Sequence, residues 1–212
     1  MDEDRLKIWE TLFGHALSII DEASPAGLPR SGWSFGGGTV LMRRHRHRVS
    51  RDIDIFVPDP QWLGYLTPRL NAKAESIAPE YVEQAGFLKL YFPEGEIDFV
   101  VSQPLTADPT VAEEIFGRTV QVETSAEIIA KKVWHRGREF TARDLFDFAL
   151  VARKEPEAIA KIAAILAARR GDISARLAAR DAALREDFVA LETLEFSPSY
   201  DDCLAAIGKS LR

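Results

Sequence analysis

The pattern of apolar residues changes near residue 124, and this change predicts a fold built from two unlike parts. Before this point, short stretches alternate apolar and polar residues, as in the DIDIFV run of Asp52–Val57, which is typical of a β-strand. After it, apolar residues recur at helical spacing and no clear strand pattern is present. We therefore expect an α+β fold, with an α/β domain over residues 1–124 and a helical domain over residues 125–212.

The N-terminal part mixes helices and strands along the chain. Helices are expected over residues 4–22 and 61–75, with a short one beginning at Thr39. The segments predicted as strands are Trp33–Phe35, Asp52–Val57, Gly86–Phe92, Ile97–Ser102 and Thr119–Thr124. The third and fourth of these are separated only by a short link, so they are predicted to form a β-hairpin.

Composition and the absence of two sequence signals argue against three classes of protein: nucleic-acid coat proteins, secreted proteins and membrane-spanning proteins. The net charge of −6 disfavours a general nucleic-acid coat protein, which would be basic overall. The single cysteine, Cys203, cannot form an internal disulfide, so a reducing compartment is expected. The N-terminal residues do not resemble a signal peptide, and no stretch approaches the roughly 18 apolar residues that a membrane span needs. We expect a cytoplasmic protein.

Two aspartates lie two residues apart in the strand candidate DIDIFV. Successive side chains of a strand point to opposite faces, so Asp52 and Asp54 share one face while Ile53 and Ile55 enter the core. Two neighbouring carboxylates repel unless positive charge lies between them, and Mg²⁺ prefers such oxygen ligands. The pair is therefore either a metal site or two solvated aspartates on an edge strand.

A third carboxylate, Asp98, lies in the second strand of the predicted hairpin. The hairpin places it opposite a residue near Tyr91, with Ile97 and Phe99 facing the core. If the hairpin adjoins the strand of Asp52 and Asp54, three carboxylates meet, which is enough to hold two metal ions for phosphoryl transfer. An exposed hairpin aspartate is the alternative.

A glycine-rich turn, Gly37, Gly38 and Thr39, precedes the predicted short helix. Glycine lets the backbone approach a ligand closely, and a helix N-terminus presents free amides to an anion. The turn therefore either binds phosphate or simply joins a strand to a helix.

Five arginines follow in nine residues: Arg43, Arg44, Arg46, Arg48 and Arg51. The intervening His45 and His47 lack the cysteine or carboxylate partners of a zinc site. Three interpretations stay open: a solvated loop, a triphosphate contact through Arg48 and Arg51, or a nucleic-acid backbone contact through Arg43 and Arg44.

A second charged segment lies in helical sequence, IIAKKVWHRGREFTARDLFDFAL. The spacing lets Lys132 share a helix face with Arg136, and Asp144 with Asp147. Ion pairs on a helix surface would explain this segment without any function.

Together, these motifs resemble those of a known family. The order GGT, DID and a later strand aspartate is similar to the signature of the DNA polymerase β nucleotidyltransferase superfamily. The stretch GGTVLMRRHRHRVSRDIDIF more narrowly resembles the AbiEii/AbiGii toxin-type nucleotidyltransferases. The residues that match the family motifs are His47, Arg48, Ser50, Asp52 and Asp54 in the first segment, and Ala130, Lys132, Arg143, Asp144 and Asp147 in the second.

The resemblance implies a nucleotidyltransferase-fold mixed sheet with flanking helices, and an enzyme that requires Mg²⁺. The residues it assigns to the nucleotide are Gly37, Gly38, Thr39, Arg48, Ser50 and Arg51. It assigns Mg²⁺ to Asp52, Asp54 and Asp98, and makes Asp98 a candidate base. By the same resemblance, Lys132 would contact phosphate and Asp144 would face the cleft.

The expected reaction moves a nucleoside monophosphate from a nucleoside triphosphate to an acceptor hydroxyl and releases pyrophosphate. The resemblance also implies the toxin of a bacterial toxin–antitoxin pair, with RNA such as tRNA as acceptor and an antitoxin protein as partner. Two alternatives stay open: transfer to a small molecule or protein, and a non-catalytic nucleotide-binding protein of the same fold.

Overall fold

The computed structural model describes residues 6–29, 31–78 and 80–211. The chain forms two compact units. The first unit comprises Met1–Val40, Ser50–Pro104 and Thr110–Glu123, and the second comprises Leu41–Val49, Leu105–Pro109 and Thr124–Arg212. The helical unit thus includes two short segments that precede residue 124 in the chain. The single domain boundary at this residue stays a prediction.

The first unit is built on a seven-stranded sheet with the order β3-β4-β5-β2-β1-β7-β6. The strands are β1 (Ser34–Gly36), β2 (Ile53–Val57), β3 (Glu80–Gln84), β4 (Phe87–Phe92), β5 (Gly95–Val101), β6 (Thr110–Ile115) and β7 (Arg118–Glu123). The β2–β5 and β1–β7 pairs are parallel and the other pairs are antiparallel. The predicted mixed sheet is confirmed.

The sequence patterns missed β3 and β6, which are the two edge strands of the sheet. Their sequences, EYVEQ and TVAEEI, carry mostly polar residues, and most of their side chains are exposed or half-buried. An edge strand has fewer neighbours to bury its side chains, so its apolar alternation is weak. The strands predicted correctly, such as β2, bury alternate residues completely.

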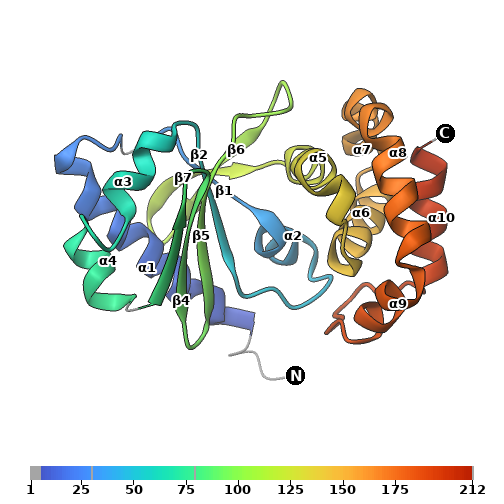
Figure 1. The fold of residues 1–212 in the computed structure, drawn as a ribbon, viewed down its shortest axis with the longest axis horizontal. Helices are drawn as coiled ribbons and strands as arrows, with labels where there is room; N and C mark the ends of the chain where they lie inside the picture. Colours follow the sequence, from blue (N-terminus) through green and yellow to red (C-terminus); the bar gives the residue numbers. More distant parts are fainter. Residues whose placement is uncertain (1–5, 30, 79, 212) are drawn as a thin grey trace. The chain divides into compact units, whose positions relative to one another are not determined.

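Three α-helices pack on one face of this sheet: α1 (Ile8–Ala23), α3 (Leu63–Leu66) and α4 (Ala72–Ile77) (Figure 1). The buried stripe of α1 includes Leu12 and Phe13, and Phe13 stacks on Phe35 of β1 with ring centroids 4.5 Å apart. The predicted helix over residues 4–22 is therefore confirmed from residue 8 onward, while residues 4 and 5 lie outside the described residues.

The single helix predicted over residues 61–75 is wrong. The chain instead forms a 3₁₀ turn, η3 (Pro60–Trp62), followed by α3 and then α4. Thr67 precedes Pro68 and is extended, with ψ of 139°, because proline disfavours the helical conformation in the residue before it. Asn71 then starts α4 as its N-cap, since its side chain accepts a hydrogen bond from Ala74 N.

The second unit contains the helices that follow residue 124: α5 (Ser125–Arg136), α6 (Ala142–Lys154), α7 (Pro156–Lys161), α8 (Ala163–Ala179), α9 (Asp181–Val189) and α10 (Tyr200–Ser210). Helix α6 is central, since α5, α7, α9 and α10 all pack against it. Its buried residues include Leu145, Phe146, Phe148 and Leu150. Among the residues that the structure describes, no helix has the length and apolar character needed to cross a membrane.

The turn from β1 into α2 (Gly37–His45) requires glycine. Gly37 has φ of +74°, which is unfavourable for any residue with a side chain. A Cβ atom at this position would lie 1.9 Å from Asp54 Oδ2. The turn therefore brings the backbone directly against a carboxylate of β2.

Replacing Gly37 by alanine tests this constraint, and Gly117→Ala is its matched control. Gly117 has a similar φ of +70°, but a Cβ there would meet no atom within 4 Å. We expect Gly117→Ala to cost about 1–2 kcal/mol of unfolding free energy through backbone strain alone. Gly37→Ala should cost about 3–5 kcal/mol, because Asp54 must also move. Urea denaturation measures both, and equal losses would contradict the close approach.

Candidate functional site

A row of paired residues crosses the centre of the sheet in the first unit. Gly36 of β1 pairs with Asp54 of β2, Asp54 pairs with Asp98 of β5, and Asp98 pairs with Lys89 of β4. Directly paired residues of neighbouring strands point to the same face. The structure therefore places the side chains of Asp54, Asp98 and Lys89 side by side.

Asp52 immediately precedes β2 and is anchored to β5, because its Oδ1 accepts a hydrogen bond from Glu96 N at 3.2 Å. Asp52 is therefore held beside β5, the strand that carries Asp98, while the three-carboxylate metal site stays a prediction. The expected hairpin register is shifted by two residues: Asp98 faces Lys89, while Tyr91 faces Glu96.

Lys89 is a site residue that the sequence patterns missed. Its Nζ donates to Asp98 Oδ2 at 2.9 Å and also to the Glu96 carboxylate. Burial lowers the pKa of Lys89, but the hydrogen bonds that its ammonium donates to Glu96 and Asp98 outweigh this effect and raise that pKa overall. The available signal was the alternation in Phe87–Phe92, where Lys89 lies between the buried Leu88 and Leu90.

Asp98 lies in a partly desolvated environment. Burial raises its pKa, and this effect exceeds the opposite effect of the Lys89 ammonium. The negative charge of Asp52 raises the pKa further. Oδ1 of Asp98 is buried and has no hydrogen-bond partner among the described residues. A buried carboxylate oxygen without a partner is unusual and fits an atom that receives a ligand.

The carboxylate oxygens of this site are suitable ligands for a divalent cation. Within residues 6–29, 31–78 and 80–211, no three Asp, Glu, His or Cys side chains already form a metal-binding group. The paired Asp54 and Asp98 nevertheless offer the hard oxygen ligands that Mg²⁺ prefers. With the buried Oδ1 of Asp98, these residues suit a cation that binds with additional oxygen ligands.

Thr39 connects the glycine turn to the aspartate strand. Its side chain is fully buried, and Oγ1 donates to Asp52 O at 2.6 Å and lies 3.1 Å from Ser50 Oγ. Its hydroxyl is therefore used to fix the backbone beside Asp52. The amides at the start of α2 remain the groups suited to an anion, since the first amides of a helix lack acceptors within it.

A buried ion-pair cluster in the second unit joins residues of the two sequence segments that match the family motifs. Its members are His47, Arg48, Lys132, Asp144 and Asp147. Asp147 is the centre, and its side chain is completely buried. Arg48 donates to it twice, from Nε at 2.7 Å and from an Nη at 2.8 Å, and His47 Nε2 lies 2.8 Å away. The guanidinium of Arg48, predicted to contact nucleotide, is therefore held by protein.

Lys132 links the two aspartates of this cluster. Its Nζ lies 2.7 Å from Asp144 Oδ1 and 3.2 Å from Asp147 Oδ2. Asp144 also closes the N-terminal capping box of α6 with Thr141. The side chain of Lys132 is only 11% exposed and those of Asp144 and Asp147 are completely buried, so the interpretation as solvated pairs on a helix surface is wrong for these three residues. Arg143 is exposed.

The charged forms of Asp144, Asp147 and Lys132 are favoured despite their burial. Burial alone would raise the pKa of Asp147, but the charges of Arg48 and Lys132 hold it well below its usual range. Burial would likewise raise the pKa of Asp144, and Lys132 and Arg136 lower it. For Lys132, burial lowers the pKa, whereas Asp144 and Asp147 raise it overall.

Other members of the arginine and histidine run also find acidic partners in the second unit. Arg46 Nε donates to Glu195 Oε1 at 2.6 Å, and His45 Nε2 lies 2.7 Å from Glu155 Oε1. Positive charges so close together in the chain repel one another, and carboxylates that lie far away in the sequence relieve this repulsion in part.

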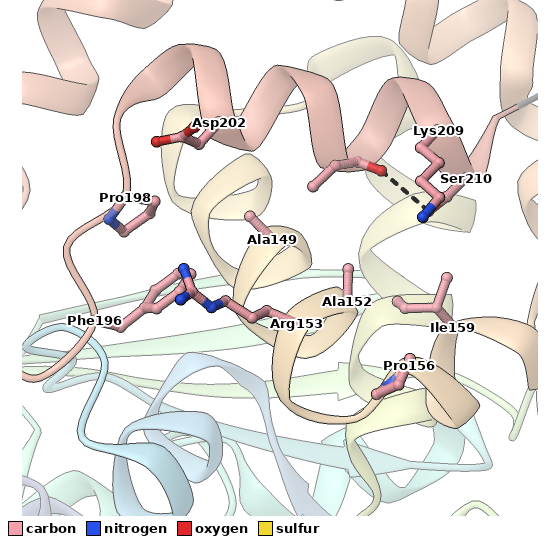
Figure 2. Close-up of a pocket in the computed structure, with 11 residues that line it drawn as sticks. Ala149, Ala152, Arg153, Pro156, Ile159, Phe196, Pro198, Asp202, Lys209 and Ser210 are labelled. Carbon is pink, nitrogen blue, oxygen red and sulfur yellow. Dashed lines mark hydrogen bonds between the residues drawn. The ribbon is translucent and has the colours of Figure 1, made fainter.

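The same unit contains a groove of about 520 Å³ lined by α6, α7, α10 and the segment before α10 (Figure 2). Its apolar lining includes Ala149, Ala152, Ile159 and Phe196. Arg153, Asp202 and Lys209 are its charged residues, and all three are exposed. The groove contains none of the motif residues, so it is not part of the candidate site.

Removing the central charge of the ion-pair cluster should destabilise the protein strongly. Asp147→Asn leaves Arg48 and Lys132 buried without their shared counterion, and we expect a loss of about 3–5 kcal/mol. Asp172→Asn is the control, because Asp172 pairs with Arg138 at the surface and its loss should matter much less. Urea denaturation of both variants checks this, and similar midpoints would contradict it.

Acidification should destabilise the protein through His47. Burial lowers the pKa of His47 below 6.5, although Asp147 opposes this shift. The unfolded chain therefore binds a proton at a higher pH than the folded protein does, and stability is lost as pH falls through this window. We expect His47→Gln to reduce the loss of unfolding free energy between about pH 7.5 and 5.5 by up to about 1.4 kcal/mol per pH unit. An unchanged pH slope in denaturation curves would refute this.

The structure is similar to that of a putative nucleotidyltransferase from H. pylori, with a TM-score of 0.53, 16% identity, and coverage of 100% of this chain and 94% of that one. It is also similar to MenT4, a nucleotidyltransferase toxin from Mycobacterium tuberculosis H37Rv, with a TM-score of 0.56, 19% identity, and coverage of 98% and 82%. These likenesses show a shared fold.

Sequence comparison identifies the family. No curated protein sequence matches the chain. The family model described as nucleotidyl transferase AbiEii toxin, Type IV TA system, matches residues 22–207, which is most of the chain. The chain therefore belongs to the AbiEii nucleotidyl transferase toxin family and is a transferase enzyme, as its motifs predict.

Proposed function

We propose that the protein is a Mg²⁺-dependent enzyme that transfers a nucleoside monophosphate from a nucleoside triphosphate to an acceptor hydroxyl. The observation that carries this proposal is the row formed by Gly36, Asp54 and Asp98 across β1, β2 and β5. It aligns a glycine turn with two carboxylates, and Asp52 is hydrogen-bonded beside them. Nucleotidyl transfer needs both elements, one for phosphate and one for the cation.

In the proposed reaction, the acceptor oxygen attacks the α-phosphorus of the triphosphate. The bond between the α-phosphorus and the oxygen that bridges to the β-phosphate breaks, and pyrophosphate leaves with that electron pair. The hydroxyl proton passes to a carboxylate, for which Asp98 is our candidate because its buried Oδ1 has no hydrogen-bond partner among the described residues. Mg²⁺ bound by Asp52, Asp54 and Asp98 would supply the positive charge that offsets the phosphate oxygens.

The glycine turn would position the triphosphate. The amides of Gly37 and Gly38 at the start of α2 would donate to its oxygens. The buried hydroxyl contact from Thr39 to Asp52 O supports this arrangement, because it fixes the turn relative to the aspartate strand. Ser50 and Arg51, which directly precede Asp52 in sequence, remain proposed nucleotide-binding residues. Arg48, whose guanidinium is held by Asp147, would act by positioning its own segment of the chain.

For Lys132 and Asp144, we propose the roles implied by the family motif. Lys132 would neutralise charge on the phosphates during transfer, and Asp144 would orient it through the ion pair of 2.7 Å. The burial of this pair supports a fixed orientation, since the carboxylate of Asp144 also accepts from Thr141 N.

The biological proposal is a toxin that modifies RNA, such as tRNA, and is counteracted by an antitoxin protein. The family description names a toxin of a type IV toxin–antitoxin system, and the structural relative MenT4 is a nucleotidyltransferase toxin. An acidic chain does not bind RNA through net charge, so RNA would have to be recognised through local basic groups.

A transfer assay tests the activity. The protein is incubated with each α-³²P-labelled nucleoside triphosphate, Mg²⁺, and total cellular RNA or total cellular protein. We expect label on RNA, and a loss of at least about a hundredfold in Asp54→Asn, because the cation loses a ligand. Asp21→Asn is the control, since Asp21 forms an exposed ion pair with Arg118 in the same unit. Undiminished transfer by Asp54→Asn would refute the site, and label on protein alone would refute the RNA acceptor.

A further inference from the structure

We infer that Lys89 makes the carboxylate site selective for a divalent cation that is already bound to triphosphate over the free cation. The inference rests on the proposed metal site and deepens it, because it concerns how that site is filled. Lys89 would act as a positioning residue, through the carboxylate of Asp98, rather than on the reacting atoms.

The position of Lys89 is set by the sheet. Its strand neighbours Leu88 and Leu90 are completely buried, so the backbone of β4 is fixed at this point. Lys89 of β4 pairs with Asp98 of β5, and the Lys89 ammonium donates to Asp98 Oδ2 at 2.9 Å. The Lys89 side chain is 25% exposed and that of Asp98 is 19% exposed, so solvent screens this pair only in part.

The ammonium takes one of the two oxygens of Asp98. The other, Oδ1, is buried and has no hydrogen-bond partner among the described residues. A cation that binds Oδ1 therefore shares its carboxylate with a positive charge that is already in place. In addition, the ammonium forms an ion pair with Glu96, so Lys89 cannot move away without breaking this second ion pair.

The charge of the incoming species then decides how strongly it binds. A free divalent cation is repelled by the ammonium a few ångströms away, and this repulsion weakens its binding. A divalent cation bound to triphosphate carries net negative charge, so the same ammonium attracts the complex. Lys89 would thus keep the site free of bare cations and favour their arrival together with the nucleotide.

Mn²⁺ binding provides a readout that is independent of catalysis. Electron paramagnetic resonance measures the affinity of the full-length protein for Mn²⁺, with and without inorganic tripolyphosphate as a base-independent probe. We expect Lys89→Met to bind free Mn²⁺ at least about tenfold more tightly than the unaltered protein, because a nearby positive charge is removed. With saturating tripolyphosphate, this gain should disappear or reverse. Lys89→Arg, which keeps the charge, should behave like the unaltered protein.

Two charge variants extend the test. In Glu96→Gln, the Lys89 ammonium keeps only its ion pair with Asp98, and the binding of free Mn²⁺ should weaken. This is the opposite of the change expected for Lys89→Met. Glu96→Gln therefore remains informative if Lys89→Met does not fold. Lys73→Met is the distant control, because Lys73 is an exposed residue of α4, and it should leave Mn²⁺ affinity unchanged.

The outcomes separate this inference from the proposed function. If Asp98→Asn weakens Mn²⁺ binding but Lys89→Met does not strengthen it, the role of Lys89 is wrong while the metal site stands. If Lys89→Met weakens binding equally with and without tripolyphosphate, Lys89 is only structural and the inference is overturned. If neither Asp98→Asn nor Asp54→Asn affects Mn²⁺ binding, the metal site itself is wrong.

Discussion

The close approach of the glycine turn to Asp54 is the constraint on which the first unit depends. No side chain fits at position 37, where a Cβ would overlap the carboxylate of Asp54. The adjacent Gly36 pairs with Asp54, so the start of α2 and the centre of β2 are held in one register. The hydroxyl of Thr39, two residues after Gly37 in α2, donates a further hydrogen bond to Asp52 O. A phosphate-binding turn and its carboxylates are thus positioned by the same local geometry.

A different kind of constraint organises the second unit. Burying charged groups is costly, and it is tolerated here because each charge of the ion-pair cluster has a close partner. Asp147 receives two hydrogen bonds from Arg48 and contacts His47 and Lys132, so three cationic or polar groups converge on one carboxylate. The cluster connects the segment Leu41–Val49 to α5 and α6, although these lie far apart in sequence.

The sequence was most informative where one face of an element is fully buried. The alternation predicted both β2 and β5 and placed Asp52 and Asp54 on one face, whereas the meeting with Asp98 depended on whether the two strands are neighbours. It could not reveal β3 or β6, since edge strands bury little, or the break before Pro68, which a local backbone restriction imposes. Lys89 was also missed, because the pairing of Lys89 with Asp98 depends on a hairpin register that composition does not determine. The motif residues of the second unit were identified, but their burial was not.

The pairing of Arg48 with Asp147 has a consequence for how such a protein can be altered by recombination. The helical unit contains Leu41–Val49, which is encoded well before the helices that it packs against. A crossover between relatives at residue 124 would combine an Arg48 from one parent with an Asp147 from the other, and any mismatch would leave a buried charge unbalanced. Exchanging only the helices after residue 124 between relatives would therefore risk separating Arg48 from its partner Asp147. Positions 48 and 147 should be inherited together.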